Sequence, residues 1–192
     1  ANDWHTGFVP YLLKHRYGNK AFYYGMKSVL SIHNAIFKGI YSYEELDFLP
    51  ELHGHFAPDA AISPTHVTML KAGVMNADKI NAVSPSYAEE LKTHLGGHGM
   101  SEEFQQRGSD LVGILNGCDY SAWDPQTDPY LPTKYKPTRQ SMVRGKKICK
   151  KELQQRVGLE ARDTAVYGMV CRLTNQKGLH YLLPILDDFL KN

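Results

Sequence analysis

Two basic residues five positions apart, Arg172 and Lys177, lie in the segment Cys171-Arg-Leu-Thr-Asn-Gln-Lys-Gly178. An arginine can hold two phosphate oxygens at once, and a lysine adds a movable point charge. The segment lies between an expected strand and an expected helix, and a helix N-terminus favours anions. This arrangement indicates a site for a phosphate or a diphosphate. An exposed loop with two solvated charges would show the same spacing.

Several polar residues follow short apolar runs and could bind a sugar. Asp3 offers a carboxylate to hydroxyl groups, and Trp4 offers an indole to the apolar face of a sugar ring. His33, Asn34 and Asn116 come where expected strands end. Ligands of open α/β sheets bind at the carboxyl ends of the strands. Each residue taken singly has a simpler interpretation. Asp3 could be an N-cap, Trp4 a half-buried packing residue and His33 a core histidine.

Three other groups of residues could carry a site, and each has a simpler explanation. His53-Gly54-His55 lacks a third ligand at a usual spacing, so a surface loop is expected there rather than a metal site. The three cysteines are far apart without a CxxC spacing, which argues against a disulfide framework or a zinc site. The tyrosine-rich residues 17–24 are expected to form a packed surface loop rather than a platform for stacking nucleic-acid bases.

Composition limits the classes of partner. The chain has 192 residues, 42% of them hydrophobic and 22% charged, with a net charge of +2. Its lysines and arginines are spread out, so no nucleic-acid partner is expected. No apolar run approaches the ~18 residues that a membrane span needs, and no signal peptide is visible. Unpaired cysteines are typical of a reducing compartment such as the cytosol.

Short β-branched runs alternate with helical patterns, which predicts an α/β fold. The expected strands are residues 28–33, 79–83, 111–115 and 165–170. The expected helices are residues 7–16, 65–77, 85–94 and 147–157, with others starting at Ser42 and Leu179. Ser42 and Glu45 form a capping-box pattern, and Ser84 is an N-cap followed by Pro85 at the first helical position. Pro184 predicts a kink or a restart in the last helix.

A change in character after Asn116 indicates a domain boundary. Residues 120–140 contain four prolines and few periodic apolar positions, as a linker does. The expected organisation is a domain part over residues 1–117, a linker over residues 118–145 and the start of a second domain over residues 146–192. One strand and two helices cannot cover a doubly wound sheet, so the second domain is expected to be incomplete.

Seven motifs in this order resemble those of bacterial glycogen synthases and plant starch synthases, which form glycosyltransferase family five. The resemblance runs from Asn2 to about Leu190, and the first and last motifs are the most telling. The motifs are Asn2-Asp-Trp-His-Thr-Gly7, Ser31-Ile-His-Asn34, Leu70-Lys-Ala-Gly73, Ala77-Asp-Lys-Ile80, Ala82-Val-Ser-Pro-Ser-Tyr87, Ile114-Leu-Asn-Gly-Cys-Asp119 and Cys171-Arg-Leu-Thr-Asn-Gln-Lys-Gly178.

The resemblance implies an internal fragment of a two-domain enzyme of the GT-B type, whose Rossmann-like domains face each other across a cleft. Residues 1–117 would be the C-terminal part of the acceptor-side catalytic domain, and residues 146–192 the start of the nucleotide-sugar-binding domain. Such enzymes move glucose from ADP-glucose, or UDP-glucose in some relatives, to the non-reducing 4-hydroxyl of an α-1,4-glucan with retention. The resemblance implies no metal or other cofactor, and a bacterial cytoplasm or a plant or algal plastid as the compartment.

The resemblance also implies roles for single residues. Arg172 and Lys177 would hold the donor diphosphate and stabilise its charge as the bond to glucose breaks. His33 would contact the reacting glucose, and Asp3 would lie near the reacting centre. Three further residues would bind substrate. Trp4 would place the acceptor glucan, Asn116 would lie near the donor, and Asn34 would be a further substrate contact. The expected mechanism is front-face displacement, in which the departing phosphate helps to take the acceptor's proton.

Two stretches typical of the family are absent from the sequence, namely the N-terminal Lys-x-Gly-Gly loop and the later Glu-x-x-Cys-Gly-Leu stretch. The isolated polypeptide is therefore expected to be inactive. Residues 53–65 also depart from the family's Phe-rich loop. The alternatives are another retaining GT-B transferase, of the sucrose or trehalose type, and a non-catalytic glucan-binding module.

Overall fold

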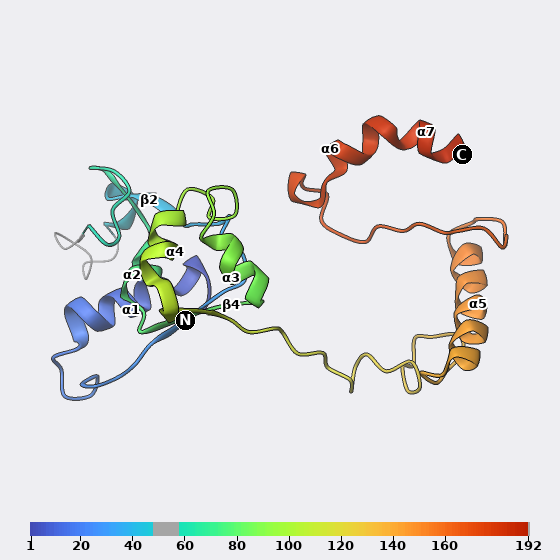
Figure 1. The fold of residues 1–192 in the computed structure, drawn as a ribbon, viewed down its shortest axis with the longest axis horizontal. Coiled ribbons are helices and arrows are strands. Elements are labelled where there is room, and N and C mark those ends of the chain that lie inside the picture. Colours follow the sequence, from blue (N-terminus) through green and yellow to red (C-terminus); the bar gives the residue numbers. More distant parts are fainter. Residues whose placement is uncertain (48–57, 192) are drawn as a thin grey trace. The chain divides into compact units, whose positions relative to one another are not determined.

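The computed structural model describes residues 1–47 and 58–191, which divide into two compact units. Unit 1 is Ala1–Gly117 and unit 2 is Cys118–Asn192. The described strands all belong to unit 1, whereas the described part of unit 2 consists of helices, turns and irregular chain (Figure 1).

Unit 1 is built on a parallel three-stranded sheet in the order β1-β4-β5. The strands are β1 (Val29–Ile32), β4 (Lys79–Ala82) and β5 (Leu111–Gly113). Ile32 pairs with Ala82, which in turn pairs with Gly113. The carboxyl ends of the three strands therefore lie at one edge of the sheet. The strands predicted over residues 28–33, 79–83 and 111–115 are confirmed, and each is shorter than expected.

The first three residues extend this sheet beyond β1. Asn2 makes a parallel bridge to Ser31, the Ser31 N–H donates to the Ala1 carbonyl at 2.9 Å, and the Asp3 N–H donates to the Ser31 carbonyl at 2.8 Å. The segment runs in the same direction as β1, so it delivers Asp3 to the same edge as the residues that follow Ile32.

Helices cover one face of the sheet. Their bounds in unit 1 are α1 (Phe8–Leu12), α2 (Met69–Asn76), α3 (Pro85–Leu91) and α4 (Ser101–Arg107), with 3-10 turns at η1 (Trp4–Thr6), η3 (Glu44–Leu46) and η5 (Gly108–Asp110). Leu30, Ile32 and Ile80 from the sheet are fully buried against Leu70 and Phe104 from the helices. On the other face, Val29 and Val112 are 51% and 45% exposed. The core thus lies between the sheet and α2, α3 and α4.

Two glycines let α1 and α2 pack closely. A Cβ added at Gly7 would lie 2.0 Å from the carbonyl oxygen of Met69, and one added at Gly73 would lie 3.0 Å from the Gly7 Cα. Any larger side chain at Gly7 would push the helices apart. This contact fixes the chain that leaves Trp4 and enters α1, so it also helps to position Asp3.

The helix predicted over residues 7–16 is confirmed, but its second half differs in type. The α-helix ends at Leu12, and residues Leu13–Tyr17 (η2) form a π-helical turn. Phe8 and Tyr11 lie about one helical turn apart and are buried, at 7% and 2% exposure.

The helix predicted over residues 65–77 begins later than expected. The structure places a strand, β3 (His66–Thr68), before α2, and β3 pairs antiparallel with β2 (Ile40–Ser42). Val67 and Thr68 are fully buried in this pair. The helical spacing of apolar residues hid the strand because three residues are too few to show a period of two. Helix α4 was also missed.

Both predicted helix caps are present. The Ser42 N–H donates to Glu45 Oε2 at 2.7 Å and the Glu45 N–H donates to Ser42 Oγ at 3.2 Å, which is the reciprocal pair of a capping box, although the helix is only the turn η3. Ser84 Oγ accepts from the Tyr87 N–H at 3.0 Å, with Pro85 at the start of α3. Helix α3 ends at Leu91, before the predicted His94.

Unit 2 contains one long helix, α5 (Arg139–Arg156), which starts well before the predicted Lys147. The strand predicted over residues 165–170 is wrong, since these residues are irregular and exposed. A parallel strand needs neighbours to bond its backbone groups, and the described part of unit 2 offers none. The remaining elements are η6 (Asn175–Lys177), α6 (Leu179–Leu182), η7 (Leu183–Ile185) and α7 (Leu186–Lys191).

Pro184 lies in η7, where a 3-10 turn separates α6 from α7. The predicted interruption of the last helix is therefore confirmed. Among residues 1–47 and 58–191, no helix combines the length and the apolar character that crossing a membrane requires.

Candidate functional site

Asp3, His33 and Asn34 meet at the carboxyl edge of the sheet in unit 1. One carboxylate oxygen of Asp3, Oδ1, accepts the His33 N–H at 2.7 Å and the Asn34 N–H at 3.2 Å. These two bonds cross from the segment beside β1 to the residues that leave β1. The carboxylate therefore fixes the backbone that presents the imidazole of His33.

The side chain of His33 is also held at this edge. Its Nε2 lies 3.0 Å from Asn2 Oδ1, and the residue is exposed to solvent. Asn34 is half-buried, and its Oδ1 accepts the Ile36 N–H at 3.1 Å, which closes a tight turn after the strand. The arrangement gives an exposed imidazole on a braced backbone, which suits contact with a polar ligand.

Asp3 adopts an uncommon backbone conformation. Its φ is +47° and its ψ is −161°. Residues other than glycine rarely adopt this combination of backbone angles. Strained residues of this kind persist where their surroundings hold them and cluster at functional sites. At Asp3 the holding contacts are the hydrogen bonds to Ser31, His33 and Asn34.

Tyr87 supports the same turn from α3. Its hydroxyl oxygen accepts the Ala35 N–H at 3.0 Å. Partial burial raises the pKa of the Tyr87 phenol, an effect only partly offset by the bond from Ala35. The phenol therefore stays neutral near pH 7. From the sequence, Tyr87 and Asn2 were parts of motifs, but neither was predicted to have a role in the site. Both belong to segments that reach the ends of the strands.

Trp4 lies beside this edge and is half-buried. Its indole stacks on the His5 ring with centroids 4.0 Å apart and packs over Gly39, where an added Cβ would lie 2.4 Å from the indole. It also lines a pocket of about 370 Å³ formed with residues 36–41. The structure thus places the predicted acceptor-binding residue next to a hollow, with its ring held by packing.

Asn116 follows β5 and is exposed. The Ile114 N–H donates to the Ala82 carbonyl at 2.9 Å, which carries the chain past the end of β4. Asn116 therefore leaves the sheet at the same edge as His33, with β4 between their strands.

Arg172 and Lys177 lie in one exposed loop of unit 2. The Thr174 N–H donates to the Arg172 carbonyl at 2.9 Å, and the Lys177 N–H donates to the Thr174 carbonyl at 3.0 Å. Gly178 then adopts a left-handed conformation with φ of +75°. The predicted loop is present, but α6 after it has only one turn, so the expected helix N-terminus contributes little. The structure groups these two cations with each other, in a different unit from Asp3 and His33.

The histidine pair at residues 53 and 55 and the three cysteines were the other candidates for a site. His53-Gly54-His55 lies outside the described residues. Within the described ranges, no group of three or more histidine, cysteine, aspartate or glutamate side chains could hold a metal ion. The three cysteines are free thiols.

Comparison with known proteins decides the family. The model of the starch synthase catalytic domain matches residues 1–106, which hold the candidate residues Asp3, Trp4, His33 and Asn34 but not Asn116. The chain belongs to this family. It is also 70% identical over 191 residues to a glycogen synthase of Vibrio vulnificus and 56% identical over 192 residues to one of Photobacterium profundum.

The family fold extends over both units. The catalytic domain of starch synthase IV from Arabidopsis thaliana, solved with ADP and acarbose, matches 99% of the chain with a TM-score of 0.81 and 28% identity. The predicted α/β fold of the GT-B type is thus confirmed. The chain spans 39% of the Vibrio relative and 39% of the Arabidopsis chain.

Proposed function

We propose that this chain is part of a glycogen synthase that transfers glucose from a nucleotide sugar to the non-reducing 4-hydroxyl of an α-1,4-glucan, with retention. The observation that carries the proposal is the 70% identity to a Vibrio glycogen synthase over the whole chain. ADP-glucose is the proposed donor, because the similar starch synthase IV was solved with ADP.

In this proposal the edge residues of unit 1 serve the sugar. His33, exposed and braced by Asp3, contacts the reacting glucose, and Asn34 shapes the turn beside it. Trp4 and its neighbouring pocket bind the acceptor chain. The similar starch synthase IV was solved with acarbose bound, which supports a carbohydrate ligand. Asn116 lies toward the donor.

Arg172 and Lys177 are proposed to bind the donor diphosphate and to stabilise the charge that develops on it. Cations that face a leaving group stabilise the transition state most when they are held in place before the reaction. Residues 1–117 and 146–192 then belong to the acceptor-side and nucleotide-sugar-binding domains, joined through residues 118–145.

The direct test is an assay of the complete polypeptide that carries this chain. We expect labelled glucose to pass from ADP-glucose to glycogen, more slowly from UDP-glucose, and the new linkage to be cleaved by an α-1,4-specific glucosidase. Glycogen binding without transfer from either donor would instead identify a non-catalytic glucan-binding module. Transfer to fructose or glucose phosphate in place of glucan would identify a sucrose- or trehalose-type enzyme.

A further inference from the structure

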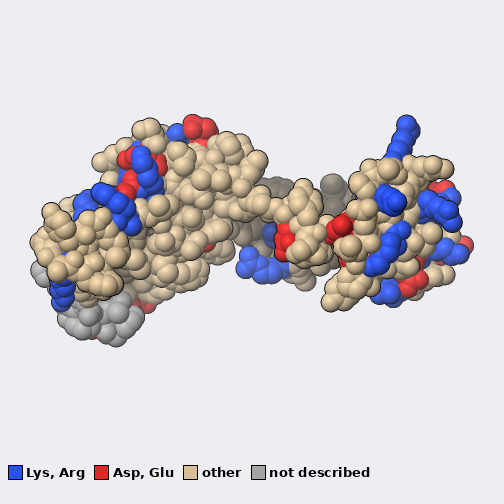
Figure 2. Space-filling view, turned by 90° about the horizontal axis from the view of Figure 1, so that it is seen from below, with Lys and Arg blue, Asp and Glu red and all other residues tan. Residues whose placement is uncertain are grey.

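The lysines and arginines of unit 2 gather around α5. Although such residues are spread over the chain as a whole, residues 134–156 contain nine of them and a single acidic residue, Glu152. Seven of the nine belong to α5 itself. Figure 2 shows lysine and arginine side chains on the surface of unit 2. A local excess of positive charge attracts anionic partners.

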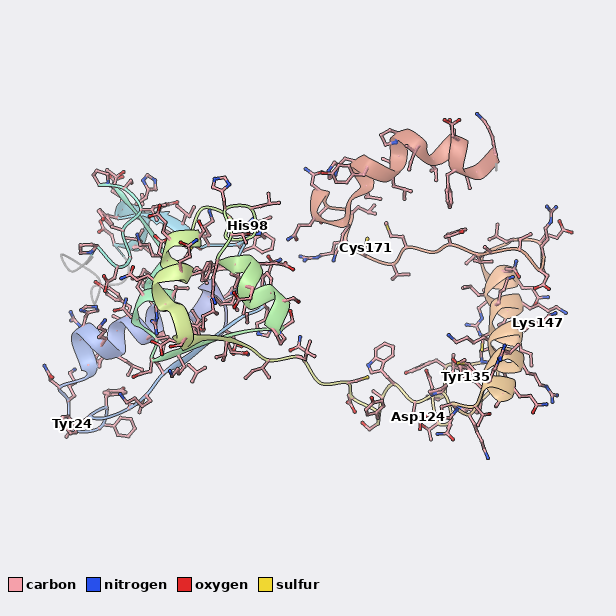
Figure 3. All side chains as sticks on the ribbon, in the orientation of Figure 1. Tyr24, His98, Asp124, Tyr135, Lys147 and Cys171 are labelled. Carbon is pink, nitrogen blue, oxygen red and sulfur yellow. The ribbon has the colours of Figure 1, made fainter. Side chains whose placement is uncertain are left out.

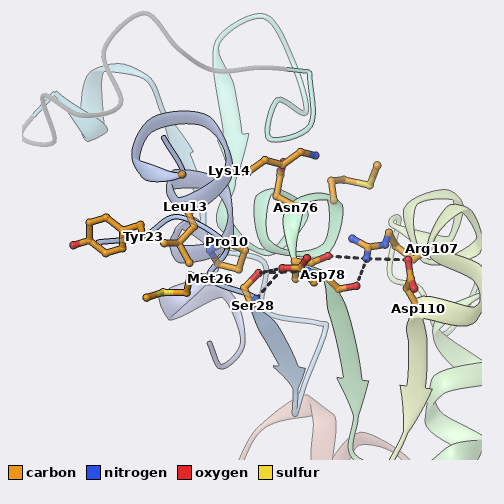
Figure 4. Close-up of a pocket in the computed structure, with 14 residues that line it drawn as sticks. Pro10, Leu13, Lys14, Tyr23, Met26, Ser28, Asn76, Asp78, Arg107 and Asp110 are labelled. Carbon is orange, nitrogen blue, oxygen red and sulfur yellow. Dashed lines mark hydrogen bonds and ion pairs between the residues drawn. The ribbon is translucent and has the colours of Figure 1, made fainter. Parts of the chain in front are cut away.

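The charged groups around Arg107 in unit 1 are, by contrast, already bonded to one another (Figure 4). Arg107 Nη2 lies 3.4 Å from Asp110 Oδ2, and the guanidinium also donates to carbonyls at the end of α2. Asp78 accepts from the Ser28 N–H and from Lys27. A ligand would have to displace these bonds, so the pocket in Figure 4 offers little to a charged partner.

Three cations form a stripe along one side of α5. Arg144, Lys147 and Lys151 follow one another at intervals of three and four residues. They therefore lie within about 60° of the helix circumference and are about 4.5 and 6 Å apart along its axis. All three are exposed, and Lys147 projects from the helix in Figure 3. These three residues are the basic stripe of α5.

The basic stripe faces away from the sides of α5 that are suited to packing. By the same helical geometry, Met142, Cys149 and Leu153 form a mainly apolar seam on the opposite side. A third side is packed already, since a Cβ added at Gly145 would lie 2.5 Å from the Tyr135 Cβ. Unpaired charged side chains are almost never fully buried. The seam is thus where a larger domain would pack, and the stripe stays at the surface.

A hollow of about 400 Å³ lies beside the basic stripe, where residues next to Arg162 pass α5. Among the described residues, its lining holds the cations Lys147, Lys150, Lys151 and Arg162 and one carboxylate, Asp163. Asp163 lies 3.6 Å from Lys147 Nζ and 3.8 Å from Lys150 Nζ. Both distances exceed those of hydrogen bonds, so an incoming carboxylate can compete for these ammonium groups.

Two cations of the basic stripe have no partner. Within residues 1–47 and 58–191, the side chains of Arg144 and Lys151 make neither a hydrogen bond nor an ion pair. Arg162, by contrast, pairs with Glu160 at 2.5 Å. An anionic partner can therefore reach Arg144 and Lys151 without breaking an existing bond.

The spacing and composition of α5 indicate the kind of anion. Glutamates three and four residues apart on a second helix are separated by the same ~4.5 and ~6 Å as the basic stripe. Val143 and Ile148, 61% and 42% exposed, flank the stripe and offer apolar contacts. α5 contains no aromatic residue to stack on a nucleic-acid base or to enter a membrane interface. An acidic helix of a protein fits this surface best.

We propose that the basic stripe of α5 and the hollow beside it bind an acidic helical segment of a partner protein. Glutamates of that segment face the stripe, and one enters the hollow. The surface shares no residue with the loop of Arg172 and Lys177 or with the edge around His33. Binding there recruits a partner without touching the substrate, and it does not depend on the transferase reaction.

Fluorescence anisotropy with the full chain tests this interaction. The probe is a labelled alanine-rich peptide of about 20 residues with glutamates at alternating intervals of three and four. A second peptide of the same composition has its glutamates distributed around the helix. We expect the first peptide to bind more tightly. Its binding should weaken between about 0.1 M and about 1 M salt, because the screening length falls from about 10 to about 3 Å.

A pair of substitutions and a matched pair locate the site. Arg144→Gln with Lys151→Gln should raise the dissociation constant of the first peptide about fivefold, as the loss of two exposed ion pairs does. Glutamine is a good helix former, and circular dichroism checks that α5 is retained. Arg156→Gln with Lys191→Gln removes as much charge from exposed cations outside the stripe and should leave binding unchanged. Neither pair should change kcat of the complete synthase.

Three results would overturn the proposal. Equal binding of the two peptides, or equal weakening by the two pairs of substitutions, would mean that net charge alone attracts the probe. Tighter binding of RNA, inorganic polyphosphate or vesicles of phosphatidylcholine and phosphatidylserine than of the first peptide would assign the stripe to a different anion.

Discussion

The Oδ1 atom of Asp3 lies 2.7 Å from the backbone nitrogen of His33, and this bond ties the N-terminal segment to the end of β1. The same oxygen accepts the Asn34 N–H at 3.2 Å. A single carboxylate therefore sets where the chain turns after the strand. It acts as a positioning group for the backbone of His33.

Replacing Asp3 should thus affect stability and transfer by different amounts. Asp3→Ala leaves two N–H groups without their acceptor, and we expect a loss of about 1–2 kcal/mol in the free energy of unfolding, since the site is partly exposed to water. Misplacing His33 should lower kcat of the complete enzyme about 100-fold. Urea unfolding and steady-state kinetics measure the two effects.

Asp3→Asn is the matched control, because an amide oxygen can still accept both bonds. It should recover most of the stability but less of the activity if the negative charge also serves the reaction. Full activity in Asp3→Ala would show that the turn does not need this carboxylate.

The two cations of unit 2 should be needed for transfer and not for folding. Both Arg172 and Lys177 are exposed, so Arg172→Ala and Lys177→Ala should leave the melting temperature unchanged. Each should lower kcat/KM for ADP-glucose about 100-fold, as the loss of a preorganised charge does. Arg162→Ala removes another exposed arginine, one that pairs with Glu160 at 2.5 Å, and should have little effect. Similar losses for all three variants would point to general electrostatics instead.

The secondary structure of unit 1 was predicted better than that of unit 2, because its strands and caps are specified by residues that are neighbours in the sequence. Strand β1 is a short, mainly apolar run followed by the polar residues His33 and Asn34. Ser84 and Ser42 have the side chains that caps require. These signals depend on residues close in sequence. The edge around Asp3, His33 and Asn34 followed from where the strands end, since parallel strands place their carboxyl ends together.

Other features could not be read from local patterns. The bonds from His33 and Asn34 to Asp3 join residues about thirty positions apart, and the phenol of Tyr87 reaches Ala35 from 52 positions away. Residues 165–170 have the composition of a strand, yet a strand exists only where partners bond its backbone. The π-helical turn of η2 has no sequence signature comparable to a cap. Each of these depends on what the rest of the chain supplies.

Arg107 closes the C-terminal end of α2. Its guanidinium donates from Nη1 to the Val74 carbonyl at 2.6 Å and from Nη2 to the Ala77 carbonyl at 2.7 Å. The last carbonyls of a helix have no partner within the helix, so this side chain replaces water there. Only 11% of the Arg107 side chain is exposed.

Arg107→Ala should therefore lower the free energy of unfolding by about 2–3 kcal/mol, because two partly buried carbonyls lose charged donors. Arg107→Lys should recover only part of this, since one ammonium cannot match the planar fork. Arg156→Ala breaks an exposed pair with Glu152 at 2.9 Å and should cost less than about 0.5 kcal/mol. Denaturant titration of the three variants ranks them, and a small effect for Arg107→Ala would show that water caps α2 equally well.

The carboxylate of Asp78 makes the stability of unit 1 depend on pH in the acid range. The Ser28 N–H donates to Asp78 Oδ2 at 2.8 Å and Lys27 donates to Oδ1 at 2.9 Å, and these bonds, the one from Ser28 first, hold the pKa of the carboxyl below its ordinary value. A lowered pKa in the folded state means that the ionised form stabilises the fold. This stabilisation is present above the unfolded pKa of about 4 and is lost as the pH falls through the lower folded value.

Asp78→Asn should accordingly destabilise the chain at pH 7 by about 1 kcal/mol, a modest figure because water screens the exposed carboxylate. The difference from the unsubstituted chain should shrink as the pH falls from about 4 through the lower folded pKa, and both side chains are neutral only below that value. Thermal unfolding followed by circular dichroism between pH 7 and pH 3 measures it. Lys27→Met is the matched control: the bonds from Ser28 are the larger cause of the lowered pKa, so this variant should retain most of the pH dependence. A gap between Asp78→Asn and the unsubstituted chain that stayed constant with pH would assign the destabilisation to altered packing of the side chain.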